Sequence, residues 1–148
     1  MNAHHRAGRA AAAIAALALA GTLAGCGGEP SLYDLKVGDC LNSSDITSEK
    51  VLTVTPLGCS TSHDLEIYAA GAMEEEEFPG RDTASSFAES FCFSEFEGFV
   101  GLPYEQSALS FSWLYPTAET WDARGDREVL CLLQSPEPVT SSLEGSAR

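Results

Sequence analysis

His63 is the residue best placed for acid–base chemistry in this chain. Hydroxyl side chains at residues 60–62 precede it and Asp64 follows it, so a nucleophile, a base and an acid lie close together in sequence. No Gly-x-Ser-x-Gly elbow accompanies them. We therefore interpret His63 as a turn histidine that hydrogen-bonds to backbone or to Asp64, and keep a small hydrolase as the alternative.

The carboxylates of Asp64 and Glu66 offer a second kind of chemistry. Residues two apart on a strand share one face, and glycosidases use two carboxylates about 5–10 Å apart. Many solvent-facing acidic pairs have the same spacing, so a glycan-acting enzyme remains an alternative and not our favoured interpretation. His63 and Glu66 are three positions apart and should face opposite sides of an extended strand, which argues against a shared metal.

The run of glutamates at residues 74–77 could supply oxygen ligands for calcium. The Asp-x-Asp-x-Asp-Gly order of an EF-hand is absent. We predict a solvated loop at this position.

One of the five cysteines, Cys26, differs from the rest in its surroundings. It ends the sequence Leu-Ala-Gly-Cys at residues 23–26, which resembles a lipobox and follows a basic N-terminus and an apolar run at residues 10–20. That run is too short to span a bilayer, which needs roughly 20 residues. The pattern predicts a lipoprotein signal peptide over residues 1–25. Acyl chains on Cys26 would hold the mature chain at the extracytoplasmic face of the cell membrane.

The four other cysteines predict two disulfides, because an even number of cysteines in an exported domain indicates pairing. Of the three possible pairings we favour Cys40–Cys59, which joins neighbouring β segments, and Cys92–Cys131, which joins a helix to the last strand. The chain has no Cys-x-x-Cys pair, which disfavours a zinc site or a thiol redox centre. We expect no metal and no cofactor.

The charge of the chain restricts its partners. It has 22 acidic and 8 basic residues, a formal net charge of −14, and loss of residues 1–25 with Arg6 and Arg9 would lower that to −16. Nucleic acid is held mainly by Lys and Arg against phosphate, so we exclude it as a partner. Anionic lipid is also repelled, so the lipid anchor must supply the attachment to the membrane.

Hydrophobic periodicity predicts an α+β fold. Apolar runs and alternation indicate β segments at residues 37–41, 51–57, 64–70, 109–115 and 128–133. Residues 81–100 predict a helix, which Asp82 or Thr83 can cap. Its expected buried stripe comprises Ala84, Phe87, Ala88, Phe91, Cys92 and Phe99. We expect a small antiparallel sheet packed against this one main helix and stapled by the two disulfides.

Aromatic side chains in the second half of the chain could form a platform for a glycan or a peptide. The alternation of Phe111, Trp113 and Tyr115 indicates that these three face the core, while Tyr104 precedes them. Trp121 lies in a predicted loop, and we single it out as a surface contact for a ligand.

Arg127 closes a predicted turn at residues 124–127 and should pair with an acid such as Asp39 or Asp126. The possible ligand contacts are therefore His63, Glu66, Trp121 and Arg127.

The mature chain predicts one domain with a short extension at each end. Residues 26–31 form a tether rich in Gly and Pro, and residues 32–134 form a domain of about 105 residues, an ordinary size for one domain. Residues 135–148 are rich in Pro, Ser and Glu and predict a disordered tail.

An ordered set of motifs runs across this domain. It consists of Val37-Gly38-Asp39-Cys40-Leu41, Cys59, His63-Asp64-Leu65-Glu66-Ile67, Cys92, Pro116, Trp121, Gly125-Asp126-Arg127 and Cys131. The set resembles the septum formation family of actinobacterial membrane proteins and lipoproteins. The resemblance covers residues 37–133, although Ser62 stands where the family more often has Pro. It implies a role at the septum or cell envelope and carries over no catalytic residues.

We therefore predict a non-enzymatic, lipid-anchored protein that binds an envelope protein or a wall component. The alternative is a small envelope hydrolase or glycan-acting enzyme that uses His63 or Asp64 and Glu66.

Overall fold

The computed structural model describes residues 31–46 and 53–148. The predicted signal peptide and Cys26 lie outside the described residues. The helices, 3-10 turns and strands are η1 (Leu32–Asp34), β1 (Cys40–Leu41), η2 (Ser43–Asp45), β2 (His63–Ala72), α1 (Arg81–Val100), η3 (Tyr104–Gln106), β3 (Ser110–Leu114), α2 (Ala118–Arg124) and β4 (Glu128–Val139).

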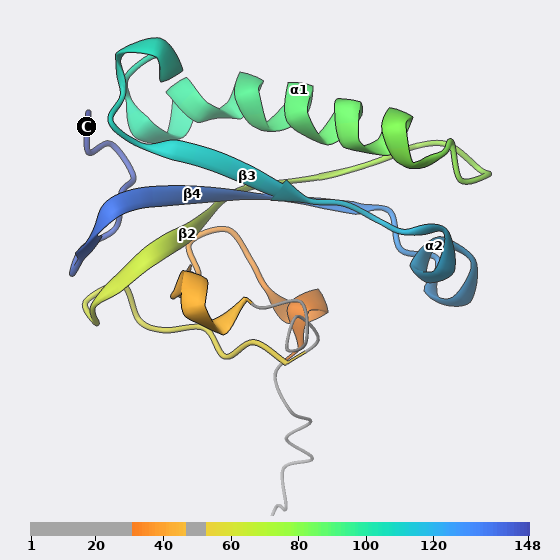
Figure 1. Cartoon of the computed structure of the whole chain (residues 1–148), viewed down its shortest axis with the longest axis horizontal. Coiled ribbons are helices and arrows are strands. Elements are labelled where there is room, and N and C mark those ends of the chain that lie inside the picture. The colour runs from red at the N-terminus through yellow and green to blue at the C-terminus, as the bar shows by residue number, and fades with distance from the viewer. Residues whose placement is uncertain (1–30, 47–52) are drawn as a thin grey trace, which may run out of the picture.

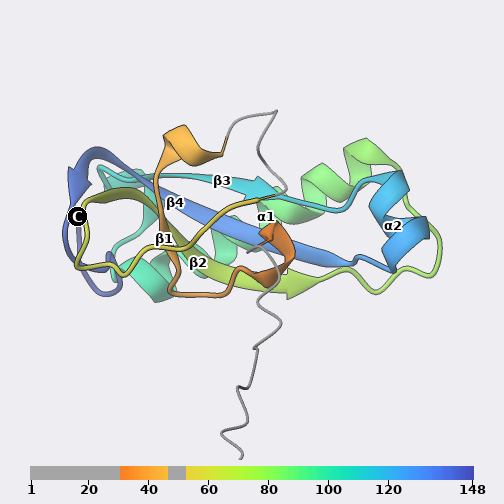
Figure 2. The same ribbon diagram turned by 90° about the horizontal axis from the view of Figure 1, so that it is seen from below.

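A four-stranded antiparallel sheet forms the centre of the domain, in the order β1-β2-β4-β3. Helix α1 covers one face, and the segment that carries β1 and the first two 3-10 turns covers the other (Figures 1 and 2). The domain therefore has three layers. The α+β class and the single main helix agree with the sequence prediction, and β3 and β1 form the two edges of the sheet.

The buried stripe of α1 repeats every fourth residue and differs from the predicted one. Its members are Ala84, Ala88, Cys92, Phe96 and Val100. Of the other predicted members, Phe91 and Phe99 are half-buried against the same cluster, whereas Phe87 is exposed, and the prediction omitted Phe96. Glycine at position 80, and not Asp82 or Thr83, occupies the N-cap position. Small alanines at the start of the stripe let the helix approach the sheet closely.

A second apolar cluster lies on the other face of the sheet, beneath the N-terminal layer. It consists of Leu35, Leu41, Val54, Leu65, Ile67, Leu130 and Leu132. Ala69, two residues after Ile67, belongs instead to the cluster beneath α1. The register of β2 against β4 shifts between Ile67 and Ala69, so the simple alternation is interrupted there.

The two disulfides have the pairing that we favour. Cys92–Cys131 joins α1 to β4 across a Cα–Cα distance of 5.4 Å. Cys40–Cys59 joins β1 to the turn before β2 across 5.3 Å. One bond therefore fixes the helix on the sheet and the other fixes the N-terminal layer.

The prediction of a disordered tail at residues 135–148 is wrong. Strand β4 continues to Val139, and Leu143 is buried in the cluster beneath α1. The backbone N–H of Gly145 donates to the carbonyl of Phe99 at 2.8 Å. The segment has the Pro, Ser and Glu content of a disordered tail, but two well-spaced apolar side chains are enough to anchor it. In the described part of the chain, no helix combines the length and apolar character that crossing a membrane requires.

Candidate functional site

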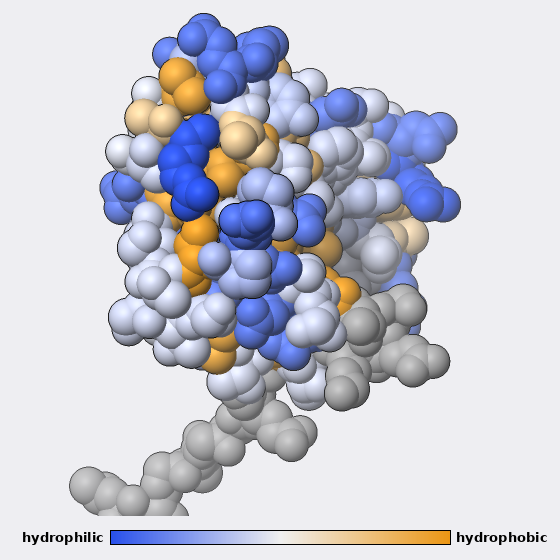
Figure 3. Space-filling model, turned by 60° about the vertical axis from the view of Figure 1, so that its left-hand side comes forward, coloured by the Kyte–Doolittle hydropathy of each residue, from blue (hydrophilic) through white to orange (hydrophobic). Residues whose placement is uncertain are grey.

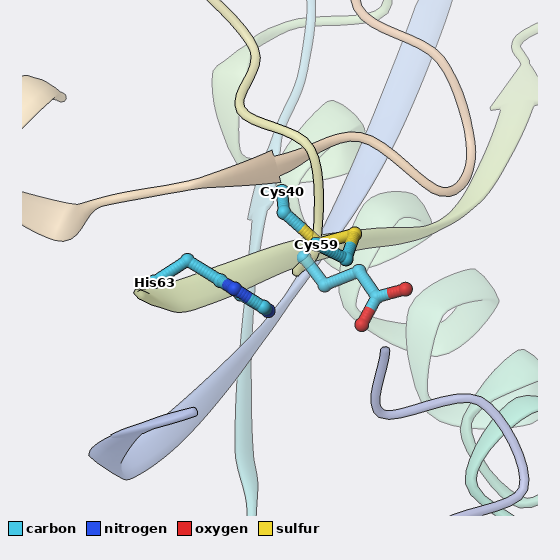
Figure 4. Close-up of side chains that lie close together, drawn as sticks. Cys40, Cys59 and His63 are labelled. Atoms are coloured by element: carbon cyan, nitrogen blue, oxygen red, sulfur yellow. A yellow bond between two sulfur atoms is a disulfide. The ribbon is translucent and has the colours of Figure 1, made fainter. Parts of the chain in front are cut away.

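His63 opens β2 and is completely buried. Its ring points toward the Cys40–Cys59 disulfide (Figure 4). The Nδ1 atom lies 2.7 Å from the carbonyl oxygen of Thr61, and Nε2 has no hydrogen-bond partner among residues 31–46 and 53–148. The predicted bond to backbone is present, but it goes to the turn and not to Asp64.

Four potential metal ligands gather around this ring. One ligand atom each from Cys40, Cys59, His63 and Glu66 lies within 4.8 Å of the others. The expectation that His63 and Glu66 face opposite sides of a strand is therefore wrong. The register of β2 against β4 shifts between His63 and Leu65, and this irregularity interrupts the alternation. Cys40 enters the group because it pairs with Glu66 across the β1–β2 ladder.

The carboxylate of Glu66 is buried, and each of its oxygens accepts a hydrogen bond from the C-terminal segment. Its two oxygens accept from the Ser142 hydroxyl at 2.7 Å and from the backbone N–H of Leu143 at 2.6 Å. Buried charge is costly without such partners. These contacts explain why a glutamate can lie inside the domain. Sequence reasoning missed the two partners because they lie 76 and 77 residues from Glu66 along the chain.

Asp64 and Glu66 do not form a joint carboxylate site. Asp64 accepts from the backbone N–H and the hydroxyl of Ser43 at 2.7 and 2.6 Å. It therefore holds the N-terminal layer, while Glu66 holds the C-terminal segment. The hydroxyl groups of residues 60–62 are exposed, whereas the ring of His63 is buried and bonded to backbone. This arrangement gives the hydrolase interpretation no supporting contact.

Trp121 is a core residue and not a surface contact. It is 2 % exposed and lies on α2, a helix that the sequence prediction missed. Its indole N–H donates to the carbonyl of Glu76 at 3.2 Å. Thr117 caps the helix directly after Pro116, and Gly125 ends it in the left-handed region, which are the signals that could have revealed it.

Arg127 packs on Trp121 and does not pair with Asp39 or with the carboxylate of Asp126. Its guanidinium lies 3.5 Å from the centre of the indole ring. It donates to the carbonyl oxygens of Trp121, Asp126 and Glu76. Arg127 therefore fixes the end of α2 against the loop before α1, which is a structural role.

The exposed candidate site is an aromatic groove between α1 and the edge strand β3. We define the aromatic groove by its lining residues, which are Glu89, Ser90, Phe93, Tyr104, Phe111 and Trp113. Phe93 is 48 % exposed, more than any other aromatic side chain in the described residues. Figure 3 shows one face of the molecule, on which apolar surface occurs in separate patches between hydrophilic side chains.

The rings of the groove support one another. Phe111 lies 5.0 Å from Tyr104, 6.4 Å from Phe93 and 5.9 Å from Trp113, measured between ring centres. The indole N–H of Trp113 donates to the hydroxyl of Ser85 on α1 at 3.3 Å. Phe111, Trp113 and Tyr115 were expected to face the core, yet they are half-buried, with one side on the core and the other accessible. Sequence reasoning missed Phe93 because it lies off the predicted stripe.

Comparisons with known proteins agree with the resemblance seen in the sequence. Two uncharacterized membrane proteins of Mycobacterium tuberculosis, from strains CDC 1551 / Oshkosh and ATCC 25618 / H37Rv, are each 29% identical to this chain over 118 residues. The match covers 72% of this chain but only 25% of each relative. No solved structure matches. The model of the septum formation family matches residues 37–148. The chain therefore belongs to the septum formation family.

Proposed function

We propose that this chain is a lipid-anchored protein of the extracytoplasmic membrane face whose domain binds another envelope protein without catalysing a reaction. Membership of the septum formation family indicates a role related to the cell envelope. The lipobox-like sequence at residues 23–26 supports the anchor. The relatives are named as membrane proteins, which supports the same location.

The aromatic groove is the observation that carries the binding role. Surface sites that hold partners are enriched in aromatic side chains, which supply large contact areas at a small cost in conformational entropy. Phe93 is held in place by Tyr104 and Phe111, so it is ordered before a partner arrives. Such preorganisation lowers the entropic cost of binding.

The position of the groove suits a protein anchored through its N-terminus. The described chain begins at Ser31 in the layer on the opposite face of the sheet from α1 (Figure 1). Cys26 precedes Ser31 by five residues, and five residues span at most about 18 Å even when extended. An acylated Cys26 therefore keeps the N-terminal layer near the membrane. The groove, on the α1 side, then faces away from the bilayer.

Charge indicates the chemistry of the partner. Helix α1, one wall of the groove, carries four acidic residues and one basic residue. The whole chain has a formal net charge of −14. Charge complementarity favours a partner segment that carries Lys or Arg, and the exposed aromatic rings can add cation–π contacts. We therefore propose a basic segment of an envelope protein as the partner.

Site-specific photo-crosslinking tests this proposal in the cells that make the protein. A photoreactive phenylalanine analogue replaces Phe93 in one variant and Phe87 in the control. Phe87 is 37 % exposed on the same helix but does not line the groove. We expect a discrete adduct from position 93 alone, with a yield that falls as salt is added to isolated membranes. Mass spectrometry of the adduct identifies the partner segment and its charge.

Two outcomes would refute the proposal. One is an equal pattern of adducts from both positions. The other is no adduct from position 93 in a variant whose circular dichroism spectrum matches that of the natural protein. The anchor is tested separately, because mass spectrometry of the membrane-extracted chain must show acyl groups on an N-terminal Cys26.

A further inference from the structure

We propose that Cys40, Cys59, His63 and Glu66 bind one Zn²⁺ ion when the Cys40–Cys59 disulfide is reduced. In the oxidised domain their ligand atoms already lie within 4.8 Å of one another. Zinc binds thiolate, imidazole and carboxylate groups, most often with four ligands in a tetrahedron. With metal–ligand distances of about 2.0–2.3 Å, neighbouring ligand atoms lie roughly 3.5 Å apart, so small side-chain movements suffice.

The hydrogen bond of His63 prepares its ring for a metal. The carbonyl oxygen of Thr61 can only accept, so Nδ1 carries the proton in the bond between them at 2.7 Å. In the neutral ring Nε2 then presents a lone pair. This atom is buried and has no hydrogen-bond partner in the part of the chain that the structure describes. Metal-binding histidines use the same arrangement, in which a backbone carbonyl accepts from one ring nitrogen and the other nitrogen binds the ion.

Glu66 is held in an equivalent way. Ser142 and Leu143 each donate one hydrogen bond to a different carboxylate oxygen. Each oxygen has two lone pairs, so Glu66 can bind a metal through one of them and keep both donors. The C-terminal segment therefore orients the carboxylate toward the cluster and closes the site on that side.

The Cys40–Cys59 disulfide is more accessible than the second one. Cys59 is half-buried, in a turn before β2 (Figure 4). Cys92 and Cys131 are completely buried between α1 and β4. Exchange needs access to a sulfur atom. A reductant therefore opens Cys40–Cys59 first, while the helix stays bound to the sheet.

Reduction of the Cys40–Cys59 disulfide consumes two electrons and two protons. Two electrons from a reductant break the S–S bond and yield two thiols. The reductant is either a pair of thiols, which becomes a disulfide, or a phosphine, which takes the oxygen of one water molecule and becomes its oxide. Zn²⁺ then displaces one proton from each of Cys40 and Cys59, because only thiolates bind the metal. A disulfide oxidant later accepts two electrons from the two thiolates and two protons from solvent, and becomes two thiols. The Cys40–Cys59 bond forms again and the ion is released. The site thus links metal binding to the redox state.

Co²⁺ titration of the purified chain tests the site. A phosphine is the reductant, because it does not compete for the metal as a dithiol does. We expect no binding before reduction and one Co²⁺ per chain afterwards, with the visible absorption of a tetrahedral ion and thiolate-to-metal charge transfer. Addition of one equivalent of Zn²⁺ should displace the Co²⁺.

Variants distinguish this site from adventitious binding. His63→Ala and Glu66→Gln should weaken Co²⁺ binding by on the order of tenfold or more, whereas Asp64→Asn, a neighbouring carboxylate outside the cluster, should not change it. If reduction unfolds the domain, the metal should restore its circular dichroism spectrum, because binding and folding are then coupled. A reduced chain that binds no Co²⁺, or that binds it equally well as His63→Ala, overturns the proposal.

Discussion

Leu143→Ala tests whether the C-terminal segment packs as a part of the domain. The side chain is 1 % exposed in the cluster beneath α1. Replacing a buried leucine by alanine lowers the free energy of unfolding by about 2–5 kcal/mol, depending on how far the surrounding side chains fill the cavity. Leu143 lies in an irregular segment after β4, where neighbouring backbone can relax, so we expect about 2–3 kcal/mol. At roughly 4 °C per kcal/mol, Tm should fall by about 8–12 °C.

Denaturant and thermal unfolding, followed by circular dichroism without reductant, measure this change. Glu144→Ala is the matched control, because that neighbouring side chain is exposed and its loss should change the free energy of unfolding by less than about 0.5 kcal/mol. A disordered tail would make the two substitutions equivalent. A loss below about 0.5 kcal/mol for Leu143→Ala would therefore refute the packing that we describe.

Three further predictions concern single side chains, each measured by the same unfolding assay. A Cβ atom on Gly71 would lie 2.6 Å from the ring of Phe91, so Gly71→Ala should destabilise the domain by about 1–2 kcal/mol. Gly98 lies in open space on α1, so Gly98→Ala should stabilise the domain by about 0.5–1 kcal/mol. The reverse order of stabilities would contradict the packing of α1 on β2. Arg127→Lys should lower the free energy of unfolding by about 1–2 kcal/mol, because a lysine cannot donate to three carbonyls while it covers the indole ring. An unchanged free energy of unfolding would show that these contacts do not stabilise the domain. Burial raises the pKa of Tyr68 above its ordinary value of 10, so the folded domain favours the neutral phenol. Above pH 10 the free energy of unfolding should therefore fall by up to about 1.4 kcal/mol per pH unit. Tyr68→Phe should reduce this slope, and an unchanged slope in that variant would exclude Tyr68 as its cause.

The sequence predicted the elements of the core well because their signals are local. Alternation gave the central strands, and helical spacing gave residues 81–100, which are the bounds of α1. The two disulfides followed from the order of the elements that carry the cysteines. Helix α2 was not predicted, because a seven-residue helix has too few apolar residues to show a helical period.

Features that depend on contacts between distant residues could not be predicted in the same way. The partners of Glu66 are 76 and 77 residues away from it. Composition described the C-terminal segment as disordered, because Pro and Ser outnumber the two apolar residues that anchor it. The shift of register beside His63 placed its ring near Glu66, although strict alternation separates residues three apart. Local conflicts of this kind are expected where a fold forms a site.

The aromatic groove and the Cys40–Cys59 cluster lie at opposite edges of one sheet. The groove borders β3, the cluster lies at β1 and the start of β2, and β4 separates them. Cys92–Cys131 attaches α1 to β4 independently of the cluster, so the wall of the groove does not depend on the accessible disulfide. Reduction and metal binding at one edge can therefore proceed while the partner surface at the other edge keeps its shape. Because the two sites share no residue, evidence against either proposal leaves the other to be decided by its own experiment.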